Sequence, residues 1–270
     1  MQIPSASRNE RFPGARAPLR RWLAAALTLA AATGFAFQPA AAEDLKGARV
    51  LVMSKTAGYR HASIPAGQKA LLDIAREQGF TVTFTEDAAQ FNDGNLGQFD
   101  AVVFLNTTGD ILDPAQQASF ERYIGAGHGL LGIHAATDTE TDGSWPWYTA
   151  LIGARFKTHP RIQEARLVVT DPADRVVTGS PSLQGIEDFR ITDEWYDFAD
   201  GSAGRRPLIE IDRTSYEGST AQGREAIVWR NQTAGGRAFY IGLGHGDETY
   251  ASPIMHDLIV QGLRYAARSE

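Results

Sequence analysis

Three short apolar runs constrain what this 270-residue chain can fold into. They read Val-Leu-Val-Met at residues 50–53, Ala-Val-Val-Phe-Leu at residues 101–105 and Leu-Leu-Gly-Ile at residues 130–133. Unbroken apolar runs of this length are typical of strands that are buried on both faces of a parallel sheet.

Single helices are expected between these runs. Residues 66–78 carry apolar side chains at helical spacing before Gly79, and Asp113-Pro114 begins a second helix that ends near residues 125–127. A further strand is expected at residues 80–85. Strands that alternate with single helices form βαβ units, so the first half predicts a parallel sheet with right-handed crossovers.

The second half has strand-like segments with few helices between them. Residues 234–236 (Ala-Gly-Gly) predict a hairpin turn between the last two strands, and residues 253–267 predict a closing helix. The expected strands cover residues 166–170, 208–212, 226–230 and 237–242.

The first 42 residues have the features of a secretory signal peptide. Five arginines precede an apolar stretch at residues 22–37, and an Ala-x-Ala-like site precedes Glu43. The stretch is short for a membrane span, although retention as an uncleaved anchor stays open. Arg20-Arg21 match part of a twin-arginine signal. We therefore expect a periplasmic or secreted protein with one folded domain over residues 43–270.

The charge of the mature chain excludes two classes of partner. Five of the 26 basic residues and one of the 32 acidic residues lie in the signal segment, which leaves 21 basic and 31 acidic residues and a net charge of −10. Nucleic acids and anionic membranes bind basic surfaces, so neither is expected as a partner. The oligomeric state is left open.

The third apolar run ends in the turn Gly132-Ile133-His134. In α/β folds such a turn lifts a side chain to the carboxyl edge of the sheet, where active sites lie. Enzymes with a nucleophile elbow place Ser or Cys there, whereas this chain places His134 and contains no cysteine. Disulfides and cysteine-thiolate chemistry are therefore excluded.

Four of the six histidines lie in loops or at strand ends, beside Gly or Pro or close to them. His61 follows the first strand and His134 follows the fourth, so both should lie at the same edge of the sheet. His159 and His245 lie in loops of the second half. His128 and His256 are expected to be structural or surface residues.

Two further clusters combine aromatic side chains with other polar or rigid residues. Residues 193–196 read Asp-Glu-Trp-Tyr, which fits an acid or base beside a stacking surface for a sugar, or else a solvated turn. Residues 145–148 read Trp-Pro-Trp-Tyr, which fits a carbohydrate groove or a cover over the core. Histidine and carboxylate ligands suit zinc or a similar divalent ion, but no helical metal-binding spacing is present.

Seven stretches along the chain resemble the trehalose-utilisation (ThuA-like) family, whose fold is that of class I glutamine amidotransferases. They appear in the family's order and extend over almost the whole mature chain. The stretches cover residues 54–65, 85–87, 99–105, 132–136, 145–148, 192–196 and 242–245. The resemblance implies an α/β fold of the flavodoxin-like type, with a mostly parallel sheet, helices on both faces and extra antiparallel strands in the C-terminal half.

The resemblance also implies a function in the catabolism of trehalose, related disaccharides and 3-keto-glycosides. His134 stands where an amidotransferase carries its cysteine nucleophile, so glutaminase activity is not expected. We expect a lyase, hydrolase or isomerase that acts on oxidised sugars. A ketone at C3 acidifies the C2 proton, and loss of that proton lets the C1 substituent leave by β-elimination.

Roles for individual residues follow from this expectation. The catalytic candidates are His134, His61, Glu194 and His245, with His61 and His134 as metal ligands or oxyanion stabilisers and Glu194 as general base or further ligand. The substrate-binding candidates are Trp145, Trp147, Tyr196, His159 and Tyr59, with His159 and His245 also considered as acid or ligand.

Two other functions remain open on sequence alone. One is a non-catalytic carbohydrate-binding protein on the same fold. The other is a metal-dependent hydrolase or isomerase of a different small substrate, since the same residues would serve.

Overall fold

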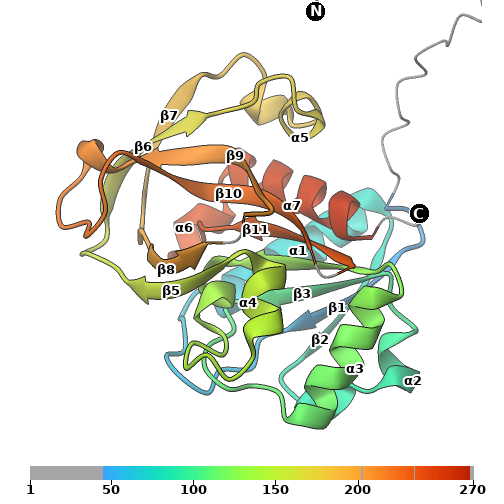
Figure 1. Cartoon of the computed structure of the whole chain (residues 1–270). Coiled ribbons are helices and arrows are strands. Elements are labelled where there is room, and N and C mark those ends of the chain that lie inside the picture. The colour runs from blue at the N-terminus through green and yellow to red at the C-terminus, as the bar shows by residue number, and fades with distance from the viewer. Residues whose placement is uncertain (1–44, 202, 234, 268–270) are drawn as a thin grey trace, which may run out of the picture. The chain divides into compact units, whose positions relative to one another are not determined.

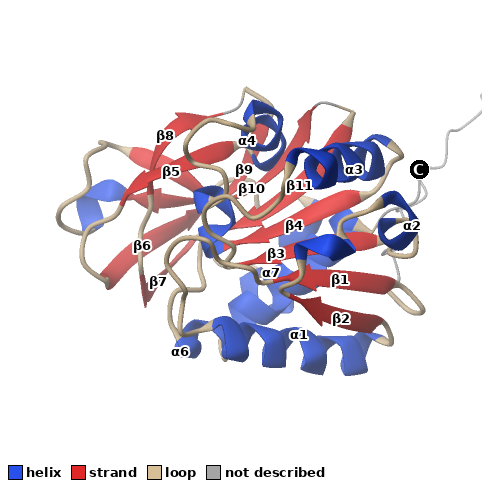
Figure 2. Cartoon of the chain, turned by 90° about the horizontal axis from the view of Figure 1, so that it is seen from below, coloured by secondary structure: helices blue, strands red, loops and turns tan. Residues whose placement is uncertain are grey.

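Five parallel strands form the centre of the sheet, in the order β2-β1-β3-β4-β11. The structure is a computed structural model that describes residues 45–201, 203–233 and 235–267 (Figure 1). Figure 2 shows the five strands side by side in this order. They are β1 (Arg49–Met53), β2 (Thr81–Thr85), β3 (Ala101–Leu105), β4 (Gly129–Ile133) and β11 (Gly236–Ile241).

Four antiparallel strands extend this sheet beyond β11, in the order β10-β9-β6-β7. Strands β10 and β11 form the expected hairpin. A separate two-stranded sheet pairs β5 (Ala154–Thr158) with β8 (Asp197–Gly201). The four added strands are β10 (Arg224–Thr233), β9 (Arg205–Asp212), β6 (Gln163–Val169) and β7 (Asp188–Asp193).

Helices cover both faces of the parallel strands, as expected (Figure 1). Helices α1 (Ile64–Gln78) and α7 (Pro253–Ala266) pack on one face, where Val50 and Val52 of β1 belong to their cluster. Helices α3 (Pro114–Gly125) and α4 (Pro146–Ile152) pack on the other face with Leu51 and Met53. Successive strand residues point to opposite faces, which is why an unbroken apolar run serves both layers. The short helices are α2 (Asp93–Leu96), α5 (Arg175–Thr178) and α6 (Asp247–Tyr250).

The expected strands and long helices of the parallel half are confirmed within three residues at each end. Strands β5, β7 and β8 and helices α2, α4, α5 and α6 were not expected. The expected signal peptide over residues 1–42 lies outside the described residues. Within the described ranges 45–201, 203–233 and 235–267, no helix is long and apolar enough to cross a membrane.

Candidate active site at the carboxyl edge of the sheet

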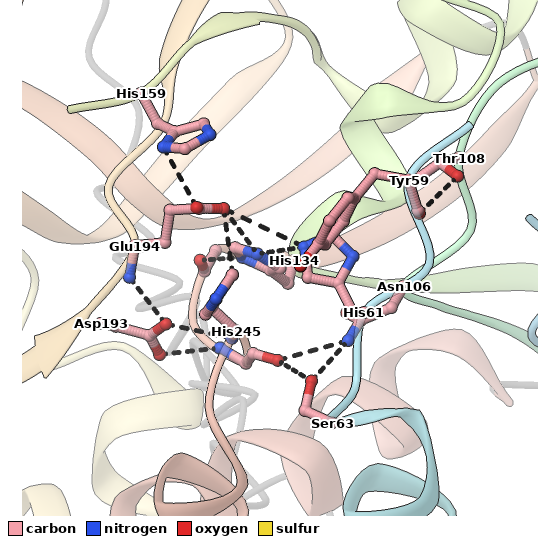
Figure 3. Close-up of polar contacts among 12 residues, drawn as sticks. Tyr59, His61, Ser63, Asn106, Thr108, His134, His159, Asp193, Glu194 and His245 are labelled. Atoms are coloured by element: carbon pink, nitrogen blue, oxygen red, sulfur yellow. Dashed lines mark hydrogen bonds and ion pairs between the residues drawn. The ribbon is translucent and has the colours of Figure 1, made fainter. Parts of the chain in front are cut away.

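Three imidazoles and one carboxylate meet where the parallel strands end. The Nε2 atoms of His61 and His134 lie 3.2 Å apart. Glu194 Oε2 lies 3.4 Å from His134 Nε2, 3.2 Å from His245 Nδ1 and 4.0 Å from His61 Nε2 (Figure 3). We name His61, His134, Glu194 and His245 the His/Glu cluster, and its four possible ligand atoms all lie within 4.8 Å of one another.

His134 reaches the cluster through a backbone conformation that few residues adopt. It directly follows β4 with a φ of +49°, in the left-handed region, and begins a 3-10 turn at His134–Asp138. A Cβ at Gly132 would lie 2.5 Å from Ile152 Cδ1 and 3.0 Å from Ala136 Cβ, so glycine lets these side chains pack closely against the end of β4. His134 Nδ1 donates to the Gly242 carbonyl at 3.1 Å, which leaves the lone pair of the neutral ring on Nε2, facing the cluster.

His61 is carried by the loop after β1, which the segment after β3 holds in place. Ala57 N and Gly58 N donate to the Thr108 carbonyl at 2.7 and 3.3 Å, and Thr108 Oγ1 donates to the Tyr59 carbonyl at 2.9 Å. Because β1 and β3 are parallel neighbours, their loops leave at the same edge. His61 and His134 therefore meet, as expected of two residues that follow parallel strands.

Glu194 and His245 come from the second half of the chain. Glu194 follows the end of β7, and His245 lies in the loop between β11 and α6. Residues 193–196 are buried, so the alternative of a solvated turn is wrong. The neighbouring Asp193 is also buried, and its carboxylate accepts hydrogen bonds from the backbone of Gly244 and His245.

The charges in the His/Glu cluster are strongly coupled. Burial alone would raise the pKa of Glu194, but the adjacent imidazoles of His134, His245 and His61 outweigh burial and hold the pKa well below its usual range. Burial lowers the pKa of His61, whereas the adjacent carboxylate of Glu194 raises the pKa of His245. Glu194 therefore favours its ionised form, and His61 favours the neutral form that can bind a cation.

The geometry of the cluster fits a tetrahedral divalent ion. Bonds of about 2.0–2.1 Å to zinc at tetrahedral angles place the ligand atoms roughly 3.3 Å apart. Three of the separations in the cluster are 3.2, 3.4 and 3.2 Å, and the separation between His61 and Glu194 is wider, at 4.0 Å. His61 Nδ1 and His245 Nδ1 are buried without a hydrogen-bond partner in the structure, although His245 Nδ1 lies close to Glu194. Three nitrogens and one oxygen suit zinc or a similar ion.

His159 and Tyr196 lie beside the cluster. His159 Nδ1 is 3.1 Å from Glu194 Oε1, the oxygen that faces away from the other histidines (Figure 3). The ring of Tyr196 lies 4.6 Å from that of His134, centre to centre, and 4.4 Å from that of Phe156. His159 is partly exposed, whereas the residues of the His/Glu cluster are largely buried. These rings form an aromatic rim around a polar centre.

Tyr59 is 63% exposed and packs edge-on against His61, with ring centres 4.8 Å apart. An exposed aromatic face beside the cluster is available for stacking on a sugar ring.

Trp145 and Trp147, the two tryptophans considered as substrate-binding residues, pack between α3 and α4. Trp145 is buried in the core, donates from Nε1 to Glu121 at 2.8 Å and stacks on Tyr148. Trp147 packs against Trp145 and Phe120. Among the described residues, neither indole has a ring contact with a histidine of the cluster. The interpretation as a cover over the core fits these contacts.

Asp138 is a residue that the sequence analysis missed. It ends the 3-10 turn that His134 begins, and its carboxylate has no hydrogen bond or ion pair with the described residues. Burial raises the pKa of Asp138 to about 6; the nearby His134 opposes this shift and Glu194 adds to it. The signal that could have found it is a carboxylate within five residues of the Gly-x-His turn, in the segment that leaves the same edge of the sheet as His134.

The fold and sequence resemble known proteins over nearly the whole described region. A family model described as trehalose utilisation matches residues 49–266. A ThuA-like protein from Bacteroides uniformis has a TM-score of 0.68 at 21% identity and covers 86% of this chain and 95% of its own. One from Parabacteroides merdae has a TM-score of 0.65 at 22% identity, with coverage of 82% and 90%.

More distant structures share the architecture. The cytoplasmic protein STM1381 from Salmonella typhimurium has a TM-score of 0.56 at 11% identity and covers 82% of this chain and 100% of its own. No curated protein matches the sequence significantly. At these identities the solved structures show the α/β fold alone, and they agree with the expected flavodoxin-like architecture.

Proposed function

The chain belongs to the trehalose-utilisation family, and from this premise we propose that it is an exported enzyme that cleaves or rearranges 3-keto-glycosides or closely related oxidised sugars. The observation that carries the proposal is the His/Glu cluster at the carboxyl edge of the parallel strands. Three imidazoles and a carboxylate with matching separations suit a bound divalent cation such as zinc.

His61, His134, Glu194 and His245 would hold the cation. A bound divalent cation supplies a Lewis acid that polarises a ketone oxygen. The lowered pKa of Glu194 favours the role of ligand over that of base, because a more acidic carboxyl group is a weaker base. The role of base then falls to another residue.

Asp138 is suited to remove the C2 proton of the substrate. Its pKa of about 6 keeps most of it ionised near neutral pH and still makes it a stronger base than an ordinary carboxylate. The C–H electron pair moves toward the ketone oxygen, and its return expels the C1 substituent as the C1–O bond breaks. His159, partly exposed beside Glu194, is placed to give a proton to the departing oxygen.

The other residues beside the cluster would bind the sugar. The exposed ring of Tyr59 offers a stacking face, and Tyr196 borders the polar centre. Trp145 is not assigned to substrate, because its indole is buried in the core.

Removal of metal tests the proposal directly. Purified protein supplied with zinc is expected to turn over 3-ketotrehalose, to lose at least about 99% of this rate after dialysis against a chelator, and to recover it when zinc is returned. Trehalose itself is the control, since without a ketone its C2 proton is not acidified.

The same assay separates the alternatives. Saturable binding of the sugar without turnover would favour a carbohydrate-binding protein. No product and no binding, with zinc or with chelator, would refute the proposed activity.

Zinc affinity is expected to rise with pH. The pKa of His245 is raised above 6.5 by Glu194, so below that pKa zinc must displace a proton from the ring. Displacing one proton makes binding about tenfold weaker for each pH unit below the pKa, and the affinity levels off above it. Competition with a chromophoric chelator at pH 6, 7 and 8 measures the effect. Equal affinities at pH 6 and 8 would contradict it.

A further inference from the structure

We propose that Asp193 is a positioning residue, which holds the loop of His245 against the strand end of Glu194 and so sets the geometry of the cation site. This inference rests on the proposed metal site. It assigns a role to a buried carboxylate that accepts hydrogen bonds from the backbone of Glu194 and His245.

Four hydrogen-bond donors converge on the carboxylate of Asp193, which is buried at the end of β7 (Figure 3). Oδ1 accepts from Glu194 N at 2.8 Å and from His245 N at 3.0 Å. Oδ2 accepts from Gly244 N at 2.9 Å and from Thr249 Oγ1 at 2.8 Å. The two backbone groups that share Oδ1 belong to two residues of the His/Glu cluster.

The sheet itself does not join these two segments. In the strand order, β10, β9 and β6 lie between β11, which precedes His245, and β7, which precedes Glu194. Apart from the Glu194–His245 pair, the hydrogen bonds between residues 193–197 and 242–249 all end on the Asp193 side chain. This carboxylate therefore fixes the distance between two ligands that backbone pairing leaves unconnected.

The loop is also held from the side of His61. The Gly244 carbonyl accepts from Ser63 Oγ at 2.9 Å and from Asn106 Nδ2 at 3.3 Å. Gly244 has a φ of +129°, and a side chain there would meet the Tyr250 hydroxyl at 2.7 Å. With its N–H bound to Asp193 and its carbonyl bound near His61, Gly244 links the ligand segments of both halves of the chain.

A carboxylate suits this position because both of its oxygens only accept. In Asp193→Asn one oxygen becomes an amide group that faces N–H or O–H donors and cannot accept from them. Residues that orient metal ligands typically change metal affinity 10- to 100-fold when replaced. We expect the zinc Kd of Asp193→Asn to rise by about that factor.

The experiment compares zinc affinities of variants, with the visible spectrum of the cobalt-substituted protein as a report on ligand geometry. Asp174→Asn is the matched control, because Asp174 is equally buried, caps α5 and pairs with Arg230 away from the cluster. Asp193→Asn is expected to weaken zinc binding and alter the cobalt spectrum, while Asp174→Asn changes neither.

Two conservative variants of Thr249 keep the test decisive if Asp193→Asn does not fold. Thr249→Val removes one donor to Asp193 and is expected to weaken zinc binding by up to about tenfold, whereas Thr249→Ser keeps the hydroxyl and the affinity. Unchanged zinc affinity in Asp193→Asn, or in Thr249→Val where Asp193→Asn does not fold, would overturn the role of Asp193 alone. Failure of the unaltered protein to bind zinc would overturn the metal site and this role together.

Discussion

Replacing His134 by alanine is expected to weaken zinc binding by about two orders of magnitude and to abolish turnover of 3-ketotrehalose. Four-ligand zinc sites bind with roughly 10–16 kcal/mol, so one ligand contributes on the order of 3 kcal/mol. The loss should be large here because the Gly242 carbonyl already orients the imidazole toward the cluster.

Two comparisons separate ligation from backbone strain at His134. Alanine tolerates a φ of +49° poorly, whereas asparagine tolerates it well, so His134→Asn removes the imidazole with less strain. Both variants should bind zinc about two orders of magnitude more weakly. His256→Ala is the control, since His256 lies in α7 and pairs with Glu77. Competition titrations measure the three affinities, and zinc binding by His134→Asn as tight as that of the unaltered protein would remove His134 from the site.

Replacing Asp138 by asparagine is expected to lower the turnover of 3-ketotrehalose by about 10²- to 10⁴-fold, the usual contribution of a general base. Asparagine has nearly the same shape and cannot take a proton. Zinc affinity should change little, because Asp138 is not one of the four possible ligands. Steady-state kinetics on zinc-loaded protein, together with the zinc Kd, measures the two effects separately.

Asp142→Asn is the matched control for this variant. Asp142 lies four residues further along and is exposed, so its replacement should leave turnover unchanged. A normal rate for Asp138→Asn would show that another group accepts the C2 proton. A parallel loss of zinc binding and turnover would assign Asp138 to the cation site instead.

Much of the parallel half could be predicted because its signals are local. Residues 101–105 are apolar throughout, and the structure has β3 at Ala101–Leu105. Asp113-Pro114 predicted the start of α3, and the Asp113 side chain indeed accepts from Gln116 N. The periodicity of a helix and the burial of a strand both repeat within a few residues, so neighbouring positions carry the information.

The peripheral elements were missed because their sequence pattern is weak. Strand β7 alternates exposed and partly buried residues and contains three charged side chains, so it lacks the apolar run of a central strand. The Trp145 cluster shows a related difficulty. An aromatic pair beside proline fits a sugar groove or a core, and only the packing of Phe120 and Tyr148 around Trp145 distinguishes them.

The sequence by itself determined the parallel strands and the meeting of His61 with His134. It also excluded cysteine-thiolate chemistry, because the chain has no cysteine. Parallel strands end at one edge, so residues that follow such strands are brought to the same side of the sheet. Only the tertiary structure decided that Glu194 and His245 complete the cluster and that Asp138 lies beside it. Glu194 and His245 follow strands that three others separate in the sheet, and the contact depends on the buried Asp193 side chain. Contacts made by side chains across such distances leave no periodic pattern in the chain.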